Sequence, residues 1–125
     1  NGEKSVLVNY CATNCSPCID EFPMIMDLSI KYEDNLKVFF VSTDWLEDKK
    51  KALKFLASQN VEGLSFLKNQ KDNDFINQTN ENWSGALPFT IVFGKQSGNV
   101  VDFWEAKASK KRFIRGINIG INEGE

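Results

Sequence analysis

Residues 6–18 read Val-Leu-Val-Asn-Tyr-Cys-Ala-Thr-Asn-Cys-Ser-Pro-Cys, an apolar run that leads directly into a Cys-x-x-Cys pair. The apolar part predicts a β-strand, and residues 17–32 have helical spacing, so the pair falls between a strand and a helix. Cys15 would then lie at a helix N-terminus, where unpaired backbone N–H groups and the helix dipole favour a negative charge. We therefore expect a lowered pKa for Cys15 and a more shielded Cys18 one turn further on. Pro17 suits the first turn, where a missing N–H costs nothing.

This pair predicts thiol–disulfide exchange. Cys15 would attack a substrate disulfide, and Cys18 would then release the mixed disulfide. Zinc sites also use Cys-x-x-Cys pairs, but a tetrahedral site needs two further ligands. The chain has three cysteines and no histidine, so Cys11 alone cannot complete such a site. We expect no metal and no organic cofactor, only the redox-active disulfide.

Cys11 opens further alternatives, because the triplet reads Cys-x3-Cys-x2-Cys. Radical-SAM enzymes have that spacing but need a much longer chain, and Sco-type copper chaperones use the Cys-x3-Cys half together with a histidine. A module that binds a metal or a protein partner through Cys11, Cys15 and Cys18 stays an alternative function. A peroxiredoxin-like thiol peroxidase is another, although Ala12 stands where that class has Thr, three residues before the reactive Cys.

The composition excludes several classes of function. The 125 residues suit one unit, and we expect a single domain over residues 1–125. Fifteen basic and seventeen acidic residues give a net charge of −2, so no basic surplus is available for nucleic acid. No apolar run approaches the roughly 18 residues of a membrane span. The absence of histidine removes Ser-His and Cys-His nucleophile pairs.

The remaining pattern predicts an α/β fold with a central mixed β-sheet flanked by helices on both faces. We expect further strands at residues 36–42, 90–93 and 100–104, a short apolar patch at 64–67, and helices at 17–32, 44–60 and 110–119. In the first helix, the expected buried stripe is Ile19, Phe22, Met26 and Ile30. Near the end of the chain, Gly116, Gly120 and Gly124 predict a frayed C-terminus.

Together these segments resemble the TlpA/ResA-type branch of the thioredoxin superfamily. The active-site segment of that family typically reads V-L-V-N-F-W-A-T-W-C-x-P-C-x-x-E-x-P, and residues 6–23 read V-L-V-N-Y-C-A-T-N-C-S-P-C-I-D-E-F-P. Residues 41–44, Val-Ser-Thr-Asp, match the end of the next strand of the family, and residues 85–90, Gly-Ala-Leu-Pro-Phe-Thr, match its cis-proline loop. The resemblance covers nearly the whole chain. It implies a thioredoxin-like fold whose usual N-terminal strands are missing from this chain.

The resemblance also implies roles for further residues. Glu21 would lie near the thiols and help to move the proton of Cys18. Pro88 would form a cis bond with Leu87, in a loop that faces the cysteines and docks an extended substrate. Support for the active site would come from Asn9, where thioredoxin itself has a buried aspartate, from Pro17, and from Pro23, which would kink the helix. Trp83 lies just ahead of the docking loop and is the tryptophan that we expect to touch a partner.

The chain departs from the family pattern at two tryptophans, which are replaced by Cys11 and Asn14. Cys11 is then either a small buried apolar residue or a third redox thiol. The resemblance implies a thiol–disulfide oxidoreductase of the reducing kind, and we expect a monomer. Its partners would be a protein disulfide and a second redox protein that recycles the pair. The implied location is extracytoplasmic in a bacterium, periplasmic or facing outward from a membrane anchor that this chain would have lost.

Overall fold

The structure is a computed structural model, and it describes residues 4–12, 15–42, 65–67, 84 and 86–124. The elements in these residues are, in chain order, β1 (Ser5–Cys11), α1 (Ser16–Lys31), β2 (Leu36–Ser42), β3 (Ser65–Leu67), β4 (Phe89–Phe93), β5 (Val100–Glu105) and α4 (Lys110–Ile121). The strands and helices expected over described residues are confirmed, with ends that differ by no more than two residues. The helix expected at 44–60 lies outside the described residues, as do Thr13, Asn14 and Trp83.

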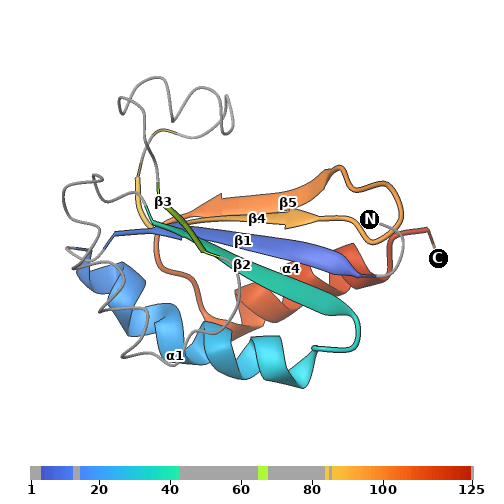
Figure 1. Ribbon diagram of the computed structural model, residues 1–125, viewed down its shortest axis with the longest axis horizontal. Helices are drawn as coiled ribbons and strands as arrows, with labels where there is room; N and C mark the ends of the chain where they lie inside the picture. Colours follow the sequence, from blue (N-terminus) through green and yellow to red (C-terminus); the bar gives the residue numbers. More distant parts are fainter. Residues whose placement is uncertain (1–3, 13–14, 43–64, 68–83, 85, 125) are drawn as a thin grey trace.

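The described strands form one mixed sheet in the order β3-β2-β1-β4-β5. β2 pairs in parallel with β1 and β3, whereas β4 pairs antiparallel with β1 and β5. The register places Tyr10 of β1 opposite Phe89 of β4. The C-terminal end of β1 therefore lies beside the N-terminal end of β4, and α1 begins at this same end of the sheet (Figure 1).

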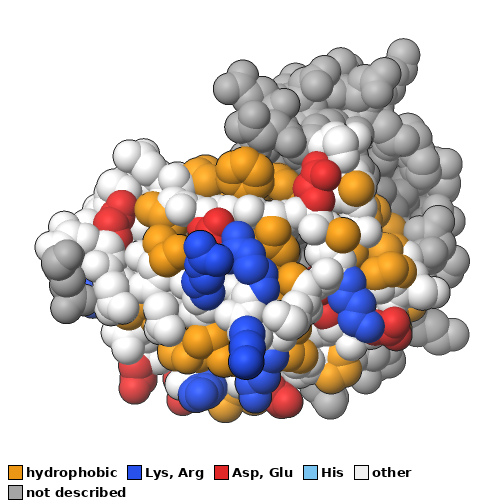
Figure 2. Space-filling model, turned by 180° about the vertical axis from the view of Figure 1, so that it is seen from behind, with side chains coloured by type: hydrophobic (Ala, Val, Ile, Leu, Met, Phe, Trp, Pro, Cys, Tyr) orange, Lys and Arg blue, Asp and Glu red, His pale blue; other side chains and the backbone are white. Residues whose placement is uncertain are grey.

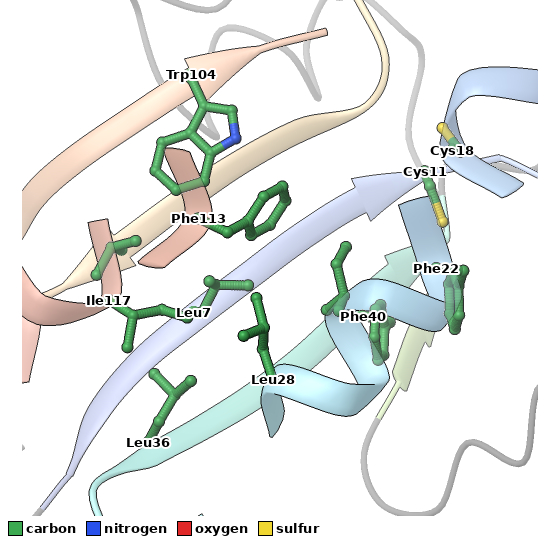
Figure 3. Packing of buried hydrophobic residues seen from close by; sticks show 12 residues of the cluster. Leu7, Cys11, Cys18, Phe22, Leu28, Leu36, Phe40, Trp104, Phe113 and Ile117 are labelled. Atoms are coloured by element: carbon green, nitrogen blue, oxygen red, sulfur yellow. The ribbon is translucent and has the colours of Figure 1, made fainter. Parts of the chain in front are cut away.

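α1 and α4 lie on one side of this sheet (Figure 1) and bury a continuous core against it. Figure 3 shows this core, in which the rings of Phe22 and Phe40 stack at 4.3 Å and Trp104 meets Phe113 edge-on at 5.0 Å. Such ring pairs add to the stabilisation that comes from the burial of apolar area. The remaining expected helix, at residues 44–60, lies outside the described residues.

The buried face of α1 differs from the expected stripe. Ile19 and Ile30 are exposed to 36% and 64%, and only Phe22 of the expected residues is fully buried. The residues that α1 buries are Cys18, Glu21, Phe22, Ile25 and Leu28. The expected stripe was wrong because it followed hydrophobicity alone, whereas the helix is rotated so that a thiol and a carboxyl group face the sheet. This rotation builds the site described below.

The expected fraying at the glycines of the last helix was also wrong. α4 continues to Ile121, and Gly116 and Gly120 are buried within it. A Cβ atom at Gly116 would lie 2.6 Å from a ring carbon of Trp104, and one at Gly120 would overlap Ser5 Oγ. The two glycines therefore allow α4 to pack closely on the sheet.

Charged side chains of both signs are mixed with apolar ones on the side of the molecule that Figure 2 shows. Arg112 of α4 makes a two-pronged hydrogen bond to Asp102, at 2.6 and 2.8 Å, and its guanidinium lies 4.1 Å from the centre of the Trp104 ring. The contacts of Arg112 thus stabilise the packing of α4 against β5. Among the described residues, no helix is long and apolar enough to cross a membrane.

Candidate active site

Cys15 and Cys18 lie where β1 gives way to α1. Cys15 is the N-cap residue of α1, with an extended backbone, and Pro17 occupies the first turn. The Cys15 carbonyl accepts a hydrogen bond from the Ile19 N–H at 3.1 Å. Cys15 is half-buried, whereas Cys18 is only 1% exposed. The structure thus has one accessible and one shielded thiol.

The two sulfur atoms lie 2.6 Å apart, in hydrogen-bond contact. A small side-chain movement would bring them to the roughly 2.05 Å of a disulfide bond. Burial raises the pKa of the Cys15 thiol to about 11, although the backbone N–H of Cys18 opposes the shift. The lowered pKa expected from the helix N-terminus was therefore wrong, because desolvation of the thiolate and then the hydrogen bond with the Cys18 thiol outweigh the backbone donor.

Cys18 has a second thiol neighbour, Cys11 at the end of β1. The contact with Cys11 and then burial raise the pKa of the Cys18 thiol well above its usual range, while a backbone N–H of Ala12 opposes them. Cys11 is itself only 5% exposed and belongs to the core cluster. Its expected burial is confirmed, and its contact with Cys18 is a finding of the tertiary structure.

A metal site built from Cys11, Cys15 and Cys18 stays an alternative prediction. All three are described, and no group of three Cys, Asp or Glu residues in the described chain could hold a metal ion.

Glu21, one turn after Cys18, is 2% exposed and hydrogen-bonded on both carboxylate oxygens. Asn9 Nδ2 donates to Oε1 at 3.3 Å, and the Ala108 backbone N–H donates to Oε2 at 3.2 Å. Burial raises the pKa of Glu21, opposed in order by the Ala108 N–H, Asn9 and the charge of Lys107. The carboxyl group therefore gains and loses its proton closer to neutral pH than an exposed glutamate does.

Asn9 links Glu21 to the neighbouring strand β4. Its Nδ2 group also donates to Thr90 Oγ1 at 3.0 Å, across the strand pair in which Asn9 and Thr90 lie opposite each other. The other side-chain atom, Asn9 Oδ1, is buried and has no hydrogen-bond partner in the described part of the chain. The amide that donates to the Glu21 carboxyl group thus has a second polar atom, Oδ1, that makes no hydrogen bond to the described residues.

The peptide bond between Leu87 and Pro88 is cis, and it lies at the same end of the sheet as the thiols. The Ala106 N–H donates to the Pro88 carbonyl at 2.8 Å, and Ala106 has a positive φ of 71°. Leu87 packs against the core cluster, as Cys15 does. Residues 106–108 therefore run between the proline loop and Glu21 and are hydrogen-bonded to both.

Sequence reasoning placed Asn9, Glu21 and Pro88 in the site, and the structure brings these residues to one end of the sheet. It missed Thr90 and the Ala108 N–H. The pattern did contain a signal for Thr90, a polar residue in an otherwise apolar strand, two positions after Pro88 and so on the same face. Nothing in the pattern indicated Ala108, since its donor is a backbone group whose position depends on the path of the chain. Pro23 lies inside α1 and is exposed.

No protein-family model and no curated protein sequence matches this chain. Solved structures do match. A thioredoxin-family thiol:disulfide interchange protein from Chlorobium tepidum TLS is 19% identical, with a TM-score of 0.78 over 95% of this chain and 81% of that one. A DsbF homologue from Corynebacterium diphtheriae is 20% identical, with a TM-score of 0.76 over 94% and 72% of the two chains.

A secreted thiol-disulfide isomerase from Corynebacterium glutamicum is 17% identical to this chain. Its TM-score is 0.74, over 98% of this chain and 73% of that one. The structural neighbours are thus thioredoxin-family thiol:disulfide interchange proteins, and the α/β fold of this chain is thioredoxin-like.

Proposed function

We propose that the chain is a thiol–disulfide oxidoreductase that reduces protein disulfides through Cys15 and Cys18. The observation that carries the proposal is the 2.6 Å separation of the two sulfur atoms at the N-terminus of α1, with Cys15 accessible and Cys18 shielded. The thioredoxin-like fold adds support, because the neighbours named above are thiol:disulfide interchange proteins.

The proposed reaction has two exchange steps. The Cys15 thiolate attacks one sulfur of the substrate disulfide, and the other substrate sulfur leaves as a thiolate that takes up a proton. The Cys18 thiolate then attacks Sγ of Cys15 in the mixed disulfide and releases the second substrate thiol. The substrate gains two electrons and two protons, and the chain ends with a Cys15–Cys18 disulfide. A second redox protein, which supplies two electrons, would return the pair to thiols.

In this scheme Glu21 accepts the proton of Cys18 before the second step. Burial raises the pKa of its carboxyl group and brings its protonation nearer to the working pH, as suits a general base. Its hydrogen bonds to Asn9 and to the Ala108 N–H hold it on the buried face that it shares with Cys18. Asn9 is thus a positioning residue in the proposal.

Substrate would dock beside the Leu87–Pro88 bond. The register of β1 and β4 supports this placement, because it brings the start of β4 next to the end of β1, after which the cysteines follow. Ser84 approaches the loop with its N–H and Oγ bonded to Glu105, at 2.6 and 3.0 Å. Trp83, the preceding residue, lies outside the described part of the chain and stays a predicted contact for the partner.

An extracytoplasmic site of action belongs to the same proposal. It rests on the resemblance to the TlpA/ResA branch and on a structural neighbour described as secreted. The reducing direction rests on the Ser16-Pro17 dipeptide between the two cysteines, which resembles the reducing members of the superfamily.

A redox titration of the purified protein tests the proposal. Dithiothreitol buffers of graded potential are quenched by alkylation, and mass spectrometry reads each cysteine. We expect Cys15 and Cys18 to exchange two electrons together, with a midpoint at or below about −220 mV. A midpoint above about −150 mV would make the pair an oxidant and overturn the reducing direction. If no reversible Cys15–Cys18 disulfide forms, the enzymatic function itself is refuted.

A further inference from the structure

Cys11 has no part in the two-step reaction, yet it lies against the resolving thiol. It is the last residue of β1, and Cys18 is in the first turn of α1. Figure 3 shows both side chains in the core at the end of β1, and the hydrogen-bond contact between the thiols makes them neighbours. Cys18 is therefore the shared neighbour of two thiols, Cys15 at 2.6 Å and Cys11, which belongs to the same core cluster as Cys18.

We propose that Cys11 is a third redox thiol, which replaces Cys15 as the disulfide partner of Cys18. The proposal rests on the proposed function, because it starts from the Cys15–Cys18 disulfide that the reduction of substrate leaves behind.

The step is an intramolecular exchange and needs no outside oxidant. The Cys11 thiolate attacks Sγ of Cys18, a Cys11–Cys18 bond forms, and the Cys15–Cys18 bond breaks. Cys15 leaves as a thiolate and takes up the proton that Cys11 lost. The numbers of electrons and protons in the chain are unchanged, so the two disulfides are isomers of one oxidised protein.

The arrangement of the three residues favours exchange over chelation. They form no group, among the described residues, that could hold a metal ion. Cys18 touches both of the others, and a backbone N–H of Ala12, the residue after Cys11, is directed at its sulfur. A sulfur that contacts two other thiols is placed to exchange one disulfide partner for the other.

The two isomers differ in the thiol that they leave unpaired. With Cys15 and Cys18 joined, the remaining thiol is Cys11, which is 5% exposed and shielded from reagents. With Cys11 and Cys18 joined, the remaining thiol is Cys15, which is half-buried and accessible. Exchange would therefore return an accessible nucleophile to a protein that is still oxidised. A mixed disulfide formed on that Cys15 could not be resolved by Cys18 while Cys11 holds it.

Two single substitutions test the pairing directly. In Cys15→Ser, diamide oxidation should join Cys11 to Cys18, so that the denatured, unreduced protein takes up no maleimide. Cys18→Ser is the matched control, since it keeps two thiols but removes the shared one, and it should take up two maleimides at low protein concentration. The inference is overturned if Cys15→Ser keeps both thiols, or if Cys18→Ser closes an intramolecular disulfide as readily. Cys15→Ala is a second form of the first variant, and circular dichroism shows which variants are folded.

The wild-type protein gives an independent measurement. After full oxidation, native alkylation followed by tandem mass spectrometry of the tryptic peptide 5–31, which holds all three cysteines, shows which thiol is accessible. We expect label on Cys15 in a fraction of the molecules, whereas label on Cys11 alone, and only after denaturation, contradicts the exchange. Cys11→Ser separates the two proposals. If Cys11→Ser still cycles between two thiols and a Cys15–Cys18 disulfide while Cys15→Ser forms no Cys11–Cys18 disulfide, the proposed function is retained and the redox role of Cys11 is refuted.

Discussion

Asn9 and Glu21, twelve residues apart in the chain, are joined by a buried hydrogen bond of 3.3 Å from Nδ2 to Oε1. The same amide nitrogen donates to Thr90, while Asn9 Oδ1 has no partner among the described residues. If the amide is turned over, Oδ1 faces Glu21 and Thr90, and it can accept from a protonated carboxyl group or from the Thr90 hydroxyl. Asn9 can therefore hydrogen-bond to Glu21 in either protonation state: it donates to the carboxylate or, with the amide turned over, accepts from the protonated carboxyl group.

Replacing Glu21 by Gln should make the stability of the protein less dependent on pH. Burial raises the pKa of Glu21 in the folded state, so its stabilising contribution is present below the unfolded value near 4.5 and is lost as pH rises through the folded value. Gln carries no such charge, and a turned Asn9 amide can accept from it. We expect the free energy of unfolding of Glu21→Gln, relative to wild type, to rise between pH 4 and pH 7. Urea denaturation at the two pH values measures it.

The matched variant is Glu21→Ala, which leaves the Asn9 amide and the Ala108 N–H without their acceptor. It should lose about 1–3 kcal/mol at both pH values, the cost of unsatisfied buried groups. Equal pH dependence in Glu21→Gln and wild type would contradict the burial of the charge.

The reduced protein should react with iodoacetamide slowly at neutral pH and much faster in alkali. With a pKa of about 11, only about one Cys15 in ten thousand is a thiolate at pH 7, so the rate should rise about tenfold per pH unit up to pH 10. A stopped alkylation series with mass detection measures it, with cysteine in a short peptide as the control. A rate that levels off below pH 9 would show that the helix N-terminus outweighs burial after all.

The same shift lowers stability in alkali. The pKa of Cys15 is raised from 9.0 in the folded state. The stabilising contribution of its protonated thiol to the free energy of unfolding is therefore complete below pH 9 and is lost as pH rises towards 11. Replacing Cys15 by Ser should remove this dependence, which urea denaturation at pH 8 and pH 10 can detect. If the free energy of unfolding of the variant falls between pH 8 and pH 10 as much as that of wild type, other groups cause the loss of stability in alkali.

Substituting the buried glycines of α4 should destabilise the protein although alanine favours helices. Alanine gains up to about 1 kcal/mol of helix propensity over glycine, but a Cβ at Gly116 would lie 2.6 Å from the Trp104 ring, and overpacking costs about 1–3 kcal/mol. Gly116→Ala and Gly120→Ala should therefore lower the free energy of unfolding. Asn118→Ala, at an exposed position of the same helix, should change it by no more than about 0.5 kcal/mol. Stabilisation by Gly116→Ala would disprove the close packing.

Ala106, whose N–H is bonded to the Pro88 carbonyl, has a left-handed backbone with φ of 71°. Such a conformation costs a residue with a Cβ about 1–2 kcal/mol, and glycine adopts it without strain. Ala106→Gly should stabilise the protein slightly, by up to about 1 kcal/mol, after the entropy gained by the unfolded chain is subtracted. Ala106→Val should destabilise it, since β-branched residues are least tolerated there. Thermal unfolding of both variants gives the sign, and equal effects would argue against the left-handed conformation.

Much of the secondary structure followed from local pattern. The alternation of β1, the continuous apolar run of β2 and the hairpin chemistry before β5 each depend on neighbours in the chain, so residues within ten positions carry the signal. The position of Cys15 at a helix N-terminus was likewise predictable from neighbouring residues in the chain. The buried face of α1 did not follow, because Ile19 and Ile30 are as apolar as Ile25 and only the docking of the helix on the sheet distinguishes them.

The sequence by itself determined the order of strands and helices, the Cys-x-x-Cys pair at the start of α1 and the absence of histidine chemistry. The tertiary structure decided how these residues meet. The register of β1 and β4 aligned Asn9 with Thr90, and the rotation of α1 buried Glu21 and set Cys18 against Cys11. The reason is physical: local preferences depend on adjacent residues, whereas burial, pKa and contacts between distant side chains depend on the packing of α1 on the sheet, which no local pattern specifies.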